Sequence, residues 1–170
     1  MRALVAVASR HGATTAIAER IGEIIRRELQ DRGTDAEVDV RSVEAVTRLD
    51  GYDAVVLGSA VYMGRWLKAA RTFANGHAAE LAEIPTWLFS SGPIGDPPKP
   101  DTDPSDVGLI MDLLHAKEHR RFAGRLDRRQ LGFAERAVVG AVKIPDGDFR
   151  DWLAIEVWAA EIAAVLGLTA

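Results

Sequence analysis

The sequence of 170 residues contains no cysteine. It therefore cannot form a disulfide bond, present a thiol nucleophile, or bind zinc or an iron–sulfur cluster through thiolates. It also has no apolar run near the roughly 20 residues of a membrane-spanning helix. The apolar segment after Met1 and Arg2 is shorter than the apolar region of a signal peptide, and no cleavage site follows it. We therefore expect a cytoplasmic protein.

Basic residues are in the minority, with 21 Lys and Arg against 25 Asp and Glu and a net charge of −4. This balance argues against a nucleic-acid-binding protein. The hydrophobic fraction of 48% is too high for a disordered chain. A chain of this length is sufficient for one continuous core, so we expect a single domain over residues 1–170.

Apolar runs of strand length alternate along the chain with segments of helical periodicity. The expected strands are residues 4–8, 36–40, 54–57, 86–89 and 121–126, and the expected helices are residues 17–29, 67–81, 107–118 and 149–166. This alternation is typical of an α/β fold, a three-layer doubly wound domain with a five-stranded parallel sheet. The charged residues of the fifth strand suit the edge of the sheet.

In such a sheet the ligand lies outside the carboxyl ends of the strands. The first loop there carries hydroxyls, a glycine and the free amides of a helix start, but no lysine, so it favours a terminal monophosphate over a nucleotide triphosphate. The alternative is that its Ser and Thr only cap the helix. The predicted phosphate site comprises Ser9, Arg10, His11, Gly12, Ala13, Thr14 and Thr15.

The string Ser9-x-x-Gly12-x-Thr14-x-x-x-Ala18-x-x-Ile21 resembles the phosphate-loop signature of flavodoxins. The resemblance implies a flavodoxin-like sheet of order 2-1-3-4-5 and FMN as the cofactor, with its phosphate in this loop. The chain departs from the signature by having Val7 in place of an aromatic residue, His11 in place of a hydroxyl residue, and Thr15 in place of an acidic or amide residue.

The same resemblance implies that the two later loops hold the flavin ring, with Tyr62 and Trp66 as flat apolar cover. The implied ring contacts in the second loop are Ser59, Ala60, Val61, Tyr62, Met63 and Gly64, and those in the third loop are Ser90, Ser91 and Gly92. The third loop continues through Pro93, Gly95 and Asp96. No catalytic acid or base is assigned, because electron transfer through a flavin does not require one.

Residues 58–64 and the pair Phe89-Ser90 resemble the flavodoxin-fold protoporphyrinogen oxidases. That resemblance implies an oxidoreductase with a porphyrinogen, a quinone or a reductase as redox partner. Residues 97–129 would correspond to the insertion of that family, and their basic run would attract a carboxylate-bearing substrate or an anionic membrane surface. A solvated basic face is the alternative reading of this run.

Two rival functions remain open, a simple electron-transfer flavodoxin and a flavin-free binding or regulatory module. Residues 115–119 spell H-x-x-E-H, an inverted zinc-protease motif whose two histidines would share one face of a helix. A zinc site also needs a third ligand downstream and a cleft, whereas this helix is expected in a basic, Pro-flanked and exposed region, so we predict no metal site.

Overall fold

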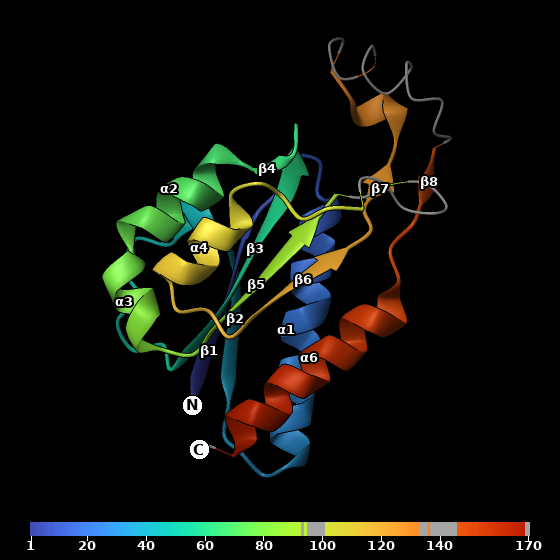
Figure 1. Cartoon of the computed structure of the whole chain (residues 1–170). Helices are drawn as coiled ribbons and strands as arrows, with labels where there is room; N and C mark the ends of the chain where they lie inside the picture. The colour runs from blue at the N-terminus through green and yellow to red at the C-terminus, as the bar shows by residue number, and fades with distance from the viewer. Residues whose placement is uncertain (93, 95–100, 133–135, 137–145, 169–170) are drawn as a thin grey trace.

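The computed structural model describes residues 1–92, 94, 101–132, 136 and 146–168. It is an α/β structure in which a parallel sheet is covered by helices on both faces (Figure 1). In chain order the elements are β1 (Arg2–Ala8), α1 (Ala13–Asp31), β2 (Glu37–Ser42), η1 (Val43–Ala45), β3 (Ala54–Tyr62), β4 (Arg65–Trp66), α2 (Lys68–Gly76), α3 (Ala78–Glu83), β5 (Thr86–Ser91), α4 (Val107–Leu113), β6 (Glu118–Phe122), β7 (Arg125–Leu126), η2 (Arg128–Gln130), β8 (Gly147–Asp148) and α6 (Trp152–Gly167).

The sheet has the order β2-β1-β3-β5-β6, and every neighbouring pair along this path is parallel. This confirms the predicted five parallel strands in the order 2-1-3-4-5. The short strand β4 is an addition that pairs antiparallel with the end of β3. The long runs of buried residues in β1, β3 and β5 arise because both faces of these central strands are covered.

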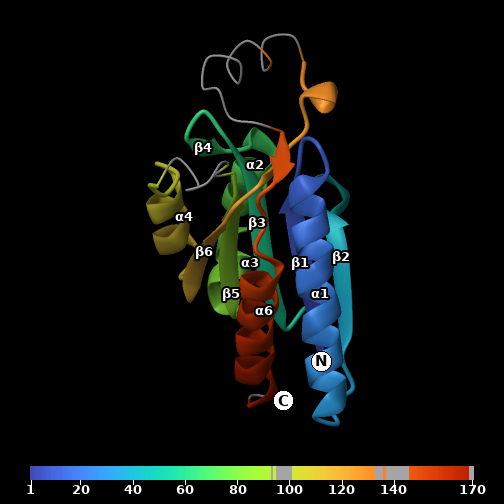
Figure 2. The same cartoon turned by 90° about the vertical axis from the view of Figure 1, so that its right-hand side faces the viewer.

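Two hydrophobic cores lie on the two faces of the sheet (Figure 2). One contains the buried faces of α1 and α6, including Ile21 and Trp158, and the other contains those of α2, α3 and α4, including Phe73 and Ile110. Phe89 projects from β5 into the first core, where its ring lies 6.3 Å from that of Trp158. Burial of these apolar surfaces stabilises the sheet that positions the loops.

The structure corrects three predicted helix boundaries. The predicted helix 67–81 is two helices, because the chain is interrupted after Gly76, a weak helix former, and α3 begins beyond His77. The predicted helix 107–118 ends at Leu113, where His115 adopts a left-handed backbone with φ of 48° and the chain turns into the next strand. The last helix begins at Trp152, three residues later than predicted, with the Asp151 side chain as its cap.

The last predicted strand is also displaced. The edge strand β6 covers Glu118–Phe122 instead of residues 121–126. Its side chains are mostly polar, so it lacks the apolar run by which the other strands are predicted. The chain leaves the sheet after Phe122. Residues 125–126 then pair with 147–148 in a separate two-stranded ribbon. This ribbon and η2 form an appended lobe, named the 125–148 lobe after the first and last residues of the ribbon, and its described residues stand beyond the carboxyl ends of the strands (Figure 1).

Candidate functional site

The carboxyl ends of β1, β3 and β5 lie side by side at one edge of the sheet. Ala8 is in register with Ser59, which is in register with Ser90, and Ala60 is in register with Ser91. The three loops selected from the sequence therefore converge at this edge (Figure 1).

The first of these loops presents an anion-binding helix start. Gly12 has a left-handed backbone with φ of 79°, and its N–H donates to the Ser9 Oγ at 3.1 Å. The first hydrogen bond of α1 runs from the Ala16 N–H to the Gly12 carbonyl. Among the described residues, the amides of Ala13, Thr14 and Thr15 have no partner, and no side chain caps α1. The interpretation of this loop as a side-chain cap is therefore wrong.

The side chain of Thr14 adds to this cradle. The residue is 3% exposed, and its hydroxyl bonds to no group in the part of the chain that the structure describes. Three amides at the positive end of a helix dipole, with a hydroxyl beside them, have the donor geometry that a phosphate monoester requires. The residues present thus fit the phosphate of FMN, and they form this cradle without a lysine.

The 125–148 lobe and the segment after it brace this loop from outside. The Arg150 side chain is 6% exposed, and its Nη1 donates to the Ala13 carbonyl at 3.2 Å while its Nη2 lies 2.6 Å from the Asp148 carboxylate. The hydrogen bonds from Arg150 hold the pKa of Asp148 below its usual value. With its amide nitrogen turned toward the loop, Gln130 donates to the His11 carbonyl at 3.2 Å. Sequence reasoning missed both braces, because their partners lie more than 100 residues away.

The second predicted loop is a β-hairpin. Ser59, Ala60, Val61 and Tyr62 belong to β3, which continues past Gly58. The turn consists of Met63 and Gly64, with φ of 51° and 72°. Positive φ at both central residues is the pattern of a type I′ turn, which matches the twist of the two strands. Tyr62 and Met63 are exposed at the end of this hairpin, and the Arg10 guanidinium lies 4.9 Å from the centre of the Tyr62 ring.

Trp66 does not lie at the surface, so its interpretation as flat cover for the flavin ring is wrong. It is 2% exposed and packs in the core between the sheet and α2. Its main-chain N–H lies 3.2 Å from both carboxylate oxygens of Asp106, which also faces the guanidinium groups of Arg65 and Arg71 at 3.9 Å and 3.7 Å. The carboxylate before α4 thus anchors the hairpin to the fold.

The hydroxyls of Ser59 and Ser90 are used within the protein. The Ser59 hydroxyl donates to the Ala60 carbonyl and accepts from the Leu67 N–H at 3.0 Å. The Ser90 Oγ accepts from the Trp66 Nε1–H at 2.7 Å and lies 2.8 Å from the His119 Nε2. Both serines are completely buried, so their side chains hold the hairpin and β5 instead of facing a ligand.

In the third loop, Ser91 is the last residue of β5 and Gly92 directly follows it. A Cβ on Gly92 would lie 2.9 Å from the Cβ of Val61, so a glycine permits the close approach of the ends of β3 and β5. The Gly92 N–H donates to the Phe122 carbonyl at 3.3 Å. The predicted continuation of this loop at Pro93, Gly95 and Asp96 lies outside the described residues, as do residues 97–100 of the predicted insertion.

The basic segment 117–129 is not one patch. Lys117 directly precedes the amino end of β6, whereas Arg128 and Arg129 lie in η2, after the chain has left the carboxyl end of that strand. A carboxylate faces each of the five arginines in the segment: Glu118 and Glu161 face Arg120, Asp101 and Asp103 face Arg121, Asp127 faces Arg125 and Arg129, and Asp146 faces Arg128. These ion pairs agree with the alternative interpretation of the run as a solvated face.

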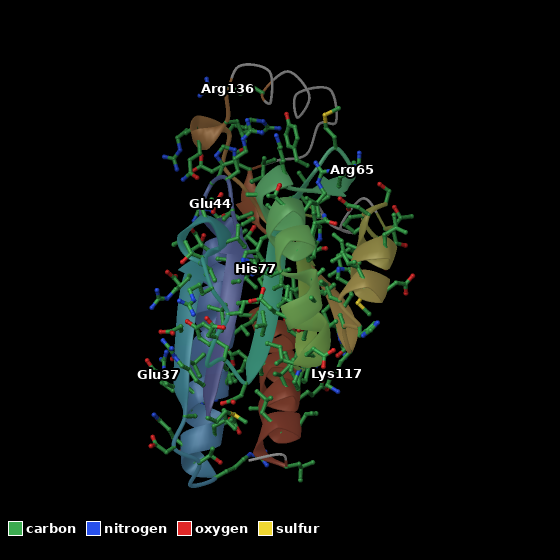
Figure 3. All side chains as sticks on the ribbon, turned by 90° about the vertical axis from the view of Figure 1, so that its left-hand side faces the viewer. Glu37, Glu44, Arg65, His77, Lys117 and Arg136 are labelled. Atoms are coloured by element: carbon green, nitrogen blue, oxygen red, sulfur yellow. The ribbon has the colours of Figure 1, made fainter. Side chains whose placement is uncertain are left out.

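Arginines also lie around the converging loops, and carboxylates face several of them. Arg136 donates to the carbonyls of Arg128 and Arg129 at 3.0 Å and 3.4 Å, and no carboxylate among the described residues faces it. Figure 3 shows Arg65 and Arg136 at this same end of the molecule. We call the described arginines here the arginine rim: Arg10, Arg65, Arg125, Arg128, Arg129 and Arg136.

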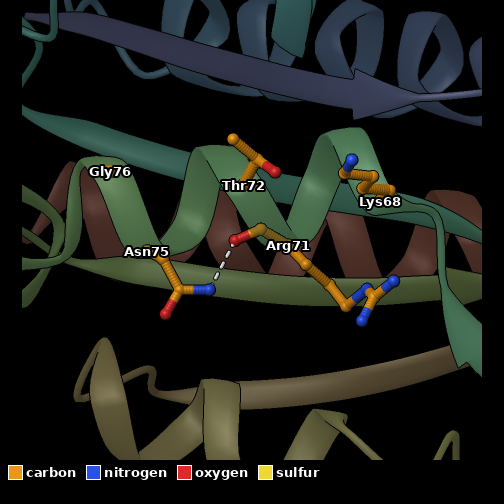
Figure 4. Close-up of a pocket in the computed structure, with 5 residues that line it drawn as sticks. All are labelled: Lys68, Arg71, Thr72, Asn75 and Gly76. Carbon is orange, nitrogen blue, oxygen red and sulfur yellow. Dashed lines mark hydrogen bonds between the residues drawn. The ribbon is translucent and has the colours of Figure 1, made fainter.

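A groove of about 600 Å³ runs along the outer side of α2 (Figure 4). Its lining residues come from this one helix, and the Asn75 amide donates to the Arg71 carbonyl at 2.7 Å. Ligand sites usually combine polar groups from several elements, as the three converging loops do. Since one helix supplies every lining residue of this groove, we do not assign it as the ligand site.

The residues of the H-x-x-E-H motif do not share a helix. His115 lies in the turn after α4, and His119 lies in β6 with its side chain almost fully covered. Within the described ranges, no three His, Asp or Glu side chains gather as metal ligands. Nor does any helix in those ranges have the length and apolar character needed to cross a membrane.

Comparison with known proteins agrees with this geometry. A family model described as a flavodoxin domain matches residues 4–151. An archaeal flavodoxin structure superposes with a TM-score of 0.66 at 17% identity, covering 98% of this chain and 99% of that chain. An oxidoreductase from Corynebacterium diphtheriae gives a TM-score of 0.62 at 14% identity, with coverages of 100% and 98%.

Part of a longer protein also matches. The flavodiiron core of Flv1 from Synechocystis gives a TM-score of 0.65 at 12% identity over all of this chain and 37% of that one. At these identities the structures show a shared fold. No functionally curated protein matches the sequence.

Proposed function

Since the chain belongs to the flavodoxin family, we propose that it is an FMN-dependent oxidoreductase whose cofactor lies where β1, β3 and β5 end. The start of α1 carries this proposal, because three amides and the Thr14 hydroxyl there have no partner among the described residues. When bound, FMN supplies the redox chemistry by accepting and releasing one or two electrons. The protein binds it, orients it and controls access to it.

Each converging loop has its own task in this proposal. Ser9, Arg10, His11, Gly12, Ala13, Thr14 and Thr15 surround the phosphate, chiefly through their main-chain donors and hydroxyls. Tyr62, Met63 and Gly64 cover one side of the ring, and Ser91 and Gly92 border its polar edge through the backbone. The buried Ser59 and Ser90 and the half-buried Ala60 and Val61 hold the hairpin and the end of β5 in place.

Within the arginine rim, carboxylates face Arg65, Arg125, Arg128 and Arg129, whereas the bonds described for Arg136 run to main-chain carbonyls. Arg136 therefore favours an anionic redox partner, because a cationic side chain beside a site raises the local concentration of anionic substrates. We therefore propose a reaction of protoporphyrinogen oxidase type, in which a carboxylate-bearing porphyrinogen is the electron donor and a quinone is the acceptor. The resemblance of residues 58–64 and 89–90 to that branch supports this finer proposal, in which residues 97–129 correspond to its insertion.

The first experiment is a titration of the purified protein with FMN, followed by flavin fluorescence. Quenching with a 1:1 stoichiometry is expected, with weaker quenching for riboflavin, which has no phosphate. An absence of flavin binding would refute the proposal and support the flavin-free binding module.

A second experiment separates an enzyme for anionic substrates from a simple electron carrier. Replacing Arg136 by Gln removes one rim charge, and we expect kcat/KM for a carboxylate-bearing porphyrinogen to fall about two- to fivefold at low salt, with less effect at high salt. Arg48→Gln is the matched control, because Arg48 is exposed and pairs with Asp50 at the amino end of β3. Absence of any porphyrinogen oxidation by the FMN-loaded protein would favour the carrier.

We also propose that residues 1–170 act as one domain, since a single five-stranded sheet carries both cores. A cytoplasmic location is part of the same proposal. Cell fractionation would test it.

A further inference from the structure

A chain of buried polar side chains crosses three strands beneath the hairpin. The Trp66 Nε1–H of β4 donates to the Ser90 Oγ of β5 at 2.7 Å, and the same oxygen lies 2.8 Å from the His119 Nε2 of β6. Trp66 and Ser90 are at most 2% exposed, and the His119 side chain is 8% exposed. Groups so well removed from water depend on one another for their hydrogen bonds.

The direction of each hydrogen bond follows from the donors available. An indole N–H can only donate, so the Ser90 oxygen accepts from Trp66. The single hydroxyl proton of Ser90 is then free to donate to the His119 Nε2, provided that this nitrogen carries no proton. Neutral His119 with its proton on Nδ1 satisfies all three groups. A protonated His119 would instead direct an N–H at the Ser90 hydroxyl, which would have to turn its proton elsewhere.

The arrangement of Ser90, His119 and Asp103 does not form a hydrolytic triad. The Ser90 oxygen is completely buried and already accepts from Trp66, so it is closed to a substrate. The carboxylate of Asp103 lies 3.8 Å from the His119 Nδ1, which is beyond hydrogen-bond distance.

This network of hydrogen-bonded side chains connects directly to the strands that border the proposed ring site. Trp66 pairs with Val61 at the base of the hairpin, directly below Tyr62 and Met63. Ser90 immediately precedes Ser91 and Gly92 at the end of β5. A change at the Ser90 hydroxyl therefore acts on both loops proposed to hold the ring.

The charged groups around His119 oppose one another. Asp103 faces it from the segment before α4, while Arg121 of β6 pairs with Asp101 and Asp103. Glu118 lies on β6 and accepts from the Trp158 indole of α6. At the Trp66 end of this hydrogen-bonded network, Asp106 faces Arg71 of α2 and Arg65 of β4. Burial is the main influence on His119, and it lowers the pKa of the imidazole below its ordinary value.

We propose that His119 is a positioning residue for the flavin ring, and that its protonation loosens the hairpin and weakens the hold of the site on the ring. This inference rests on the proposed function. His119 is neutral near pH 7, so the site is tight there and loosens as the solution becomes acidic.

Riboflavin is the suitable probe, because the phosphate of FMN itself titrates near pH 6. We expect its dissociation constant to rise about tenfold between pH 8 and pH 5, because His119 takes up a proton more readily in the free protein than in the protein with the ring bound. In H119Q, a side-chain oxygen can still accept from Ser90 but cannot titrate over this range. This variant should bind riboflavin within about threefold of wild type at pH 8, with little change at pH 5.

The matched control is H77Q, which removes a histidine that pairs with Glu80 on the surface. It should keep the full pH dependence. A pH-independent affinity in wild type, or an unchanged pH dependence in H119Q, would overturn the inference.

A second readout needs neither flavin nor a variant at position 119. In wild type, the NMR signal of the Trp66 indole N–H, assigned with W66F, should shift with pH along the same titration curve as the His119 ring signal. Independent curves would refute the coupling even if H119Q failed to fold. If no flavin binds at pH 8, the proposed function fails, while the NMR titration still decides whether His119 controls Trp66.

Discussion

Replacement of Gly12 by Ala offers a direct test of the cradle at the start of α1. Gly12 has φ of 79°, and a Cβ built on it would meet no atom within 4 Å. The effect of the substitution is therefore confined to the backbone. Gly33, just beyond the other end of α1, has the same φ of 79° and the same open space. G33A is thus a control with matched backbone strain at the end of the helix that has no proposed ligand.

The expected magnitudes follow from the backbone conformation. A left-handed L-residue costs about 1–2 kcal/mol, and the lower entropy of the unfolded chain with alanine offsets about 0.4–1 kcal/mol of this. Each variant should therefore lose about 1 kcal/mol of unfolding free energy. If the new alanine in G12A relaxes toward a negative φ, the amides that follow it turn away from the phosphate. Loss of one hydrogen bond to a charged group, about 1.5–3 kcal/mol, weakens FMN binding roughly 10- to 100-fold.

Two measurements check this reasoning. Urea unfolding should give similar losses for G12A and G33A, and fluorescence titration should show weaker FMN binding for G12A alone. Riboflavin affinity should be nearly unchanged in both variants, since riboflavin does not use the cradle. Equal losses of FMN affinity in the two variants, or equal losses for FMN and riboflavin in G12A, would refute the placement of the phosphate at α1.

Three further substitutions test other parts of the structure. G58A should cost about 3 kcal/mol or more, because the added Cβ would lie 2.0 Å from the buried ring of Phe89. The hydrogen bond from Tyr52 lowers the pKa of the Asp39 carboxyl in the folded state. Asp39 therefore stabilises the fold at neutral pH, and this stabilisation is lost as the carboxyl is protonated in acid. D39N should remove this pH-dependent stabilisation. D106A should cost about 2–3 kcal/mol by leaving the Trp66 N–H without its carboxylate partner.

Urea unfolding measures all three effects. G76A is the control for G58A, because a Cβ there meets nothing within 4 Å and the residue lies in α2. D50N is the control for D39N, since Asp50 pairs with Arg48 at the surface. The interpretation of Asp39 fails if the stability difference between pH 7 and pH 3 is the same in wild type and D39N. That of Gly58 fails if G58A and G76A are equally stable.

The sequence alone determined the layout of the sheet and the position of the first loop. Runs such as residues 4–8 and 54–57 are apolar at every position because both of their faces are buried. This signal lies within a few consecutive residues of the sequence. The spacing of Ser9, Gly12 and Thr14 likewise records a strand-to-helix turn in which the amides of a helix start stay open. Patterns of this kind need no information about distant residues.

Only the tertiary structure decided which polar side chains face one another. Trp66 could be read as a surface aromatic until the sheet brought Ser90 and Asp106 to its two N–H groups. The basic run from 117 to 129 could be interpreted as one patch until the fold placed its first part in β6 and brought Asp101, Asp103 and Asp146 from other segments to its arginines. Arg150 donates to the first residue of α1 from 137 positions away. Hydrophobic periodicity predicts burial, which is a property of a single residue. A hydrogen bond or an ion pair depends on two residues, and only the fold brings distant residues together.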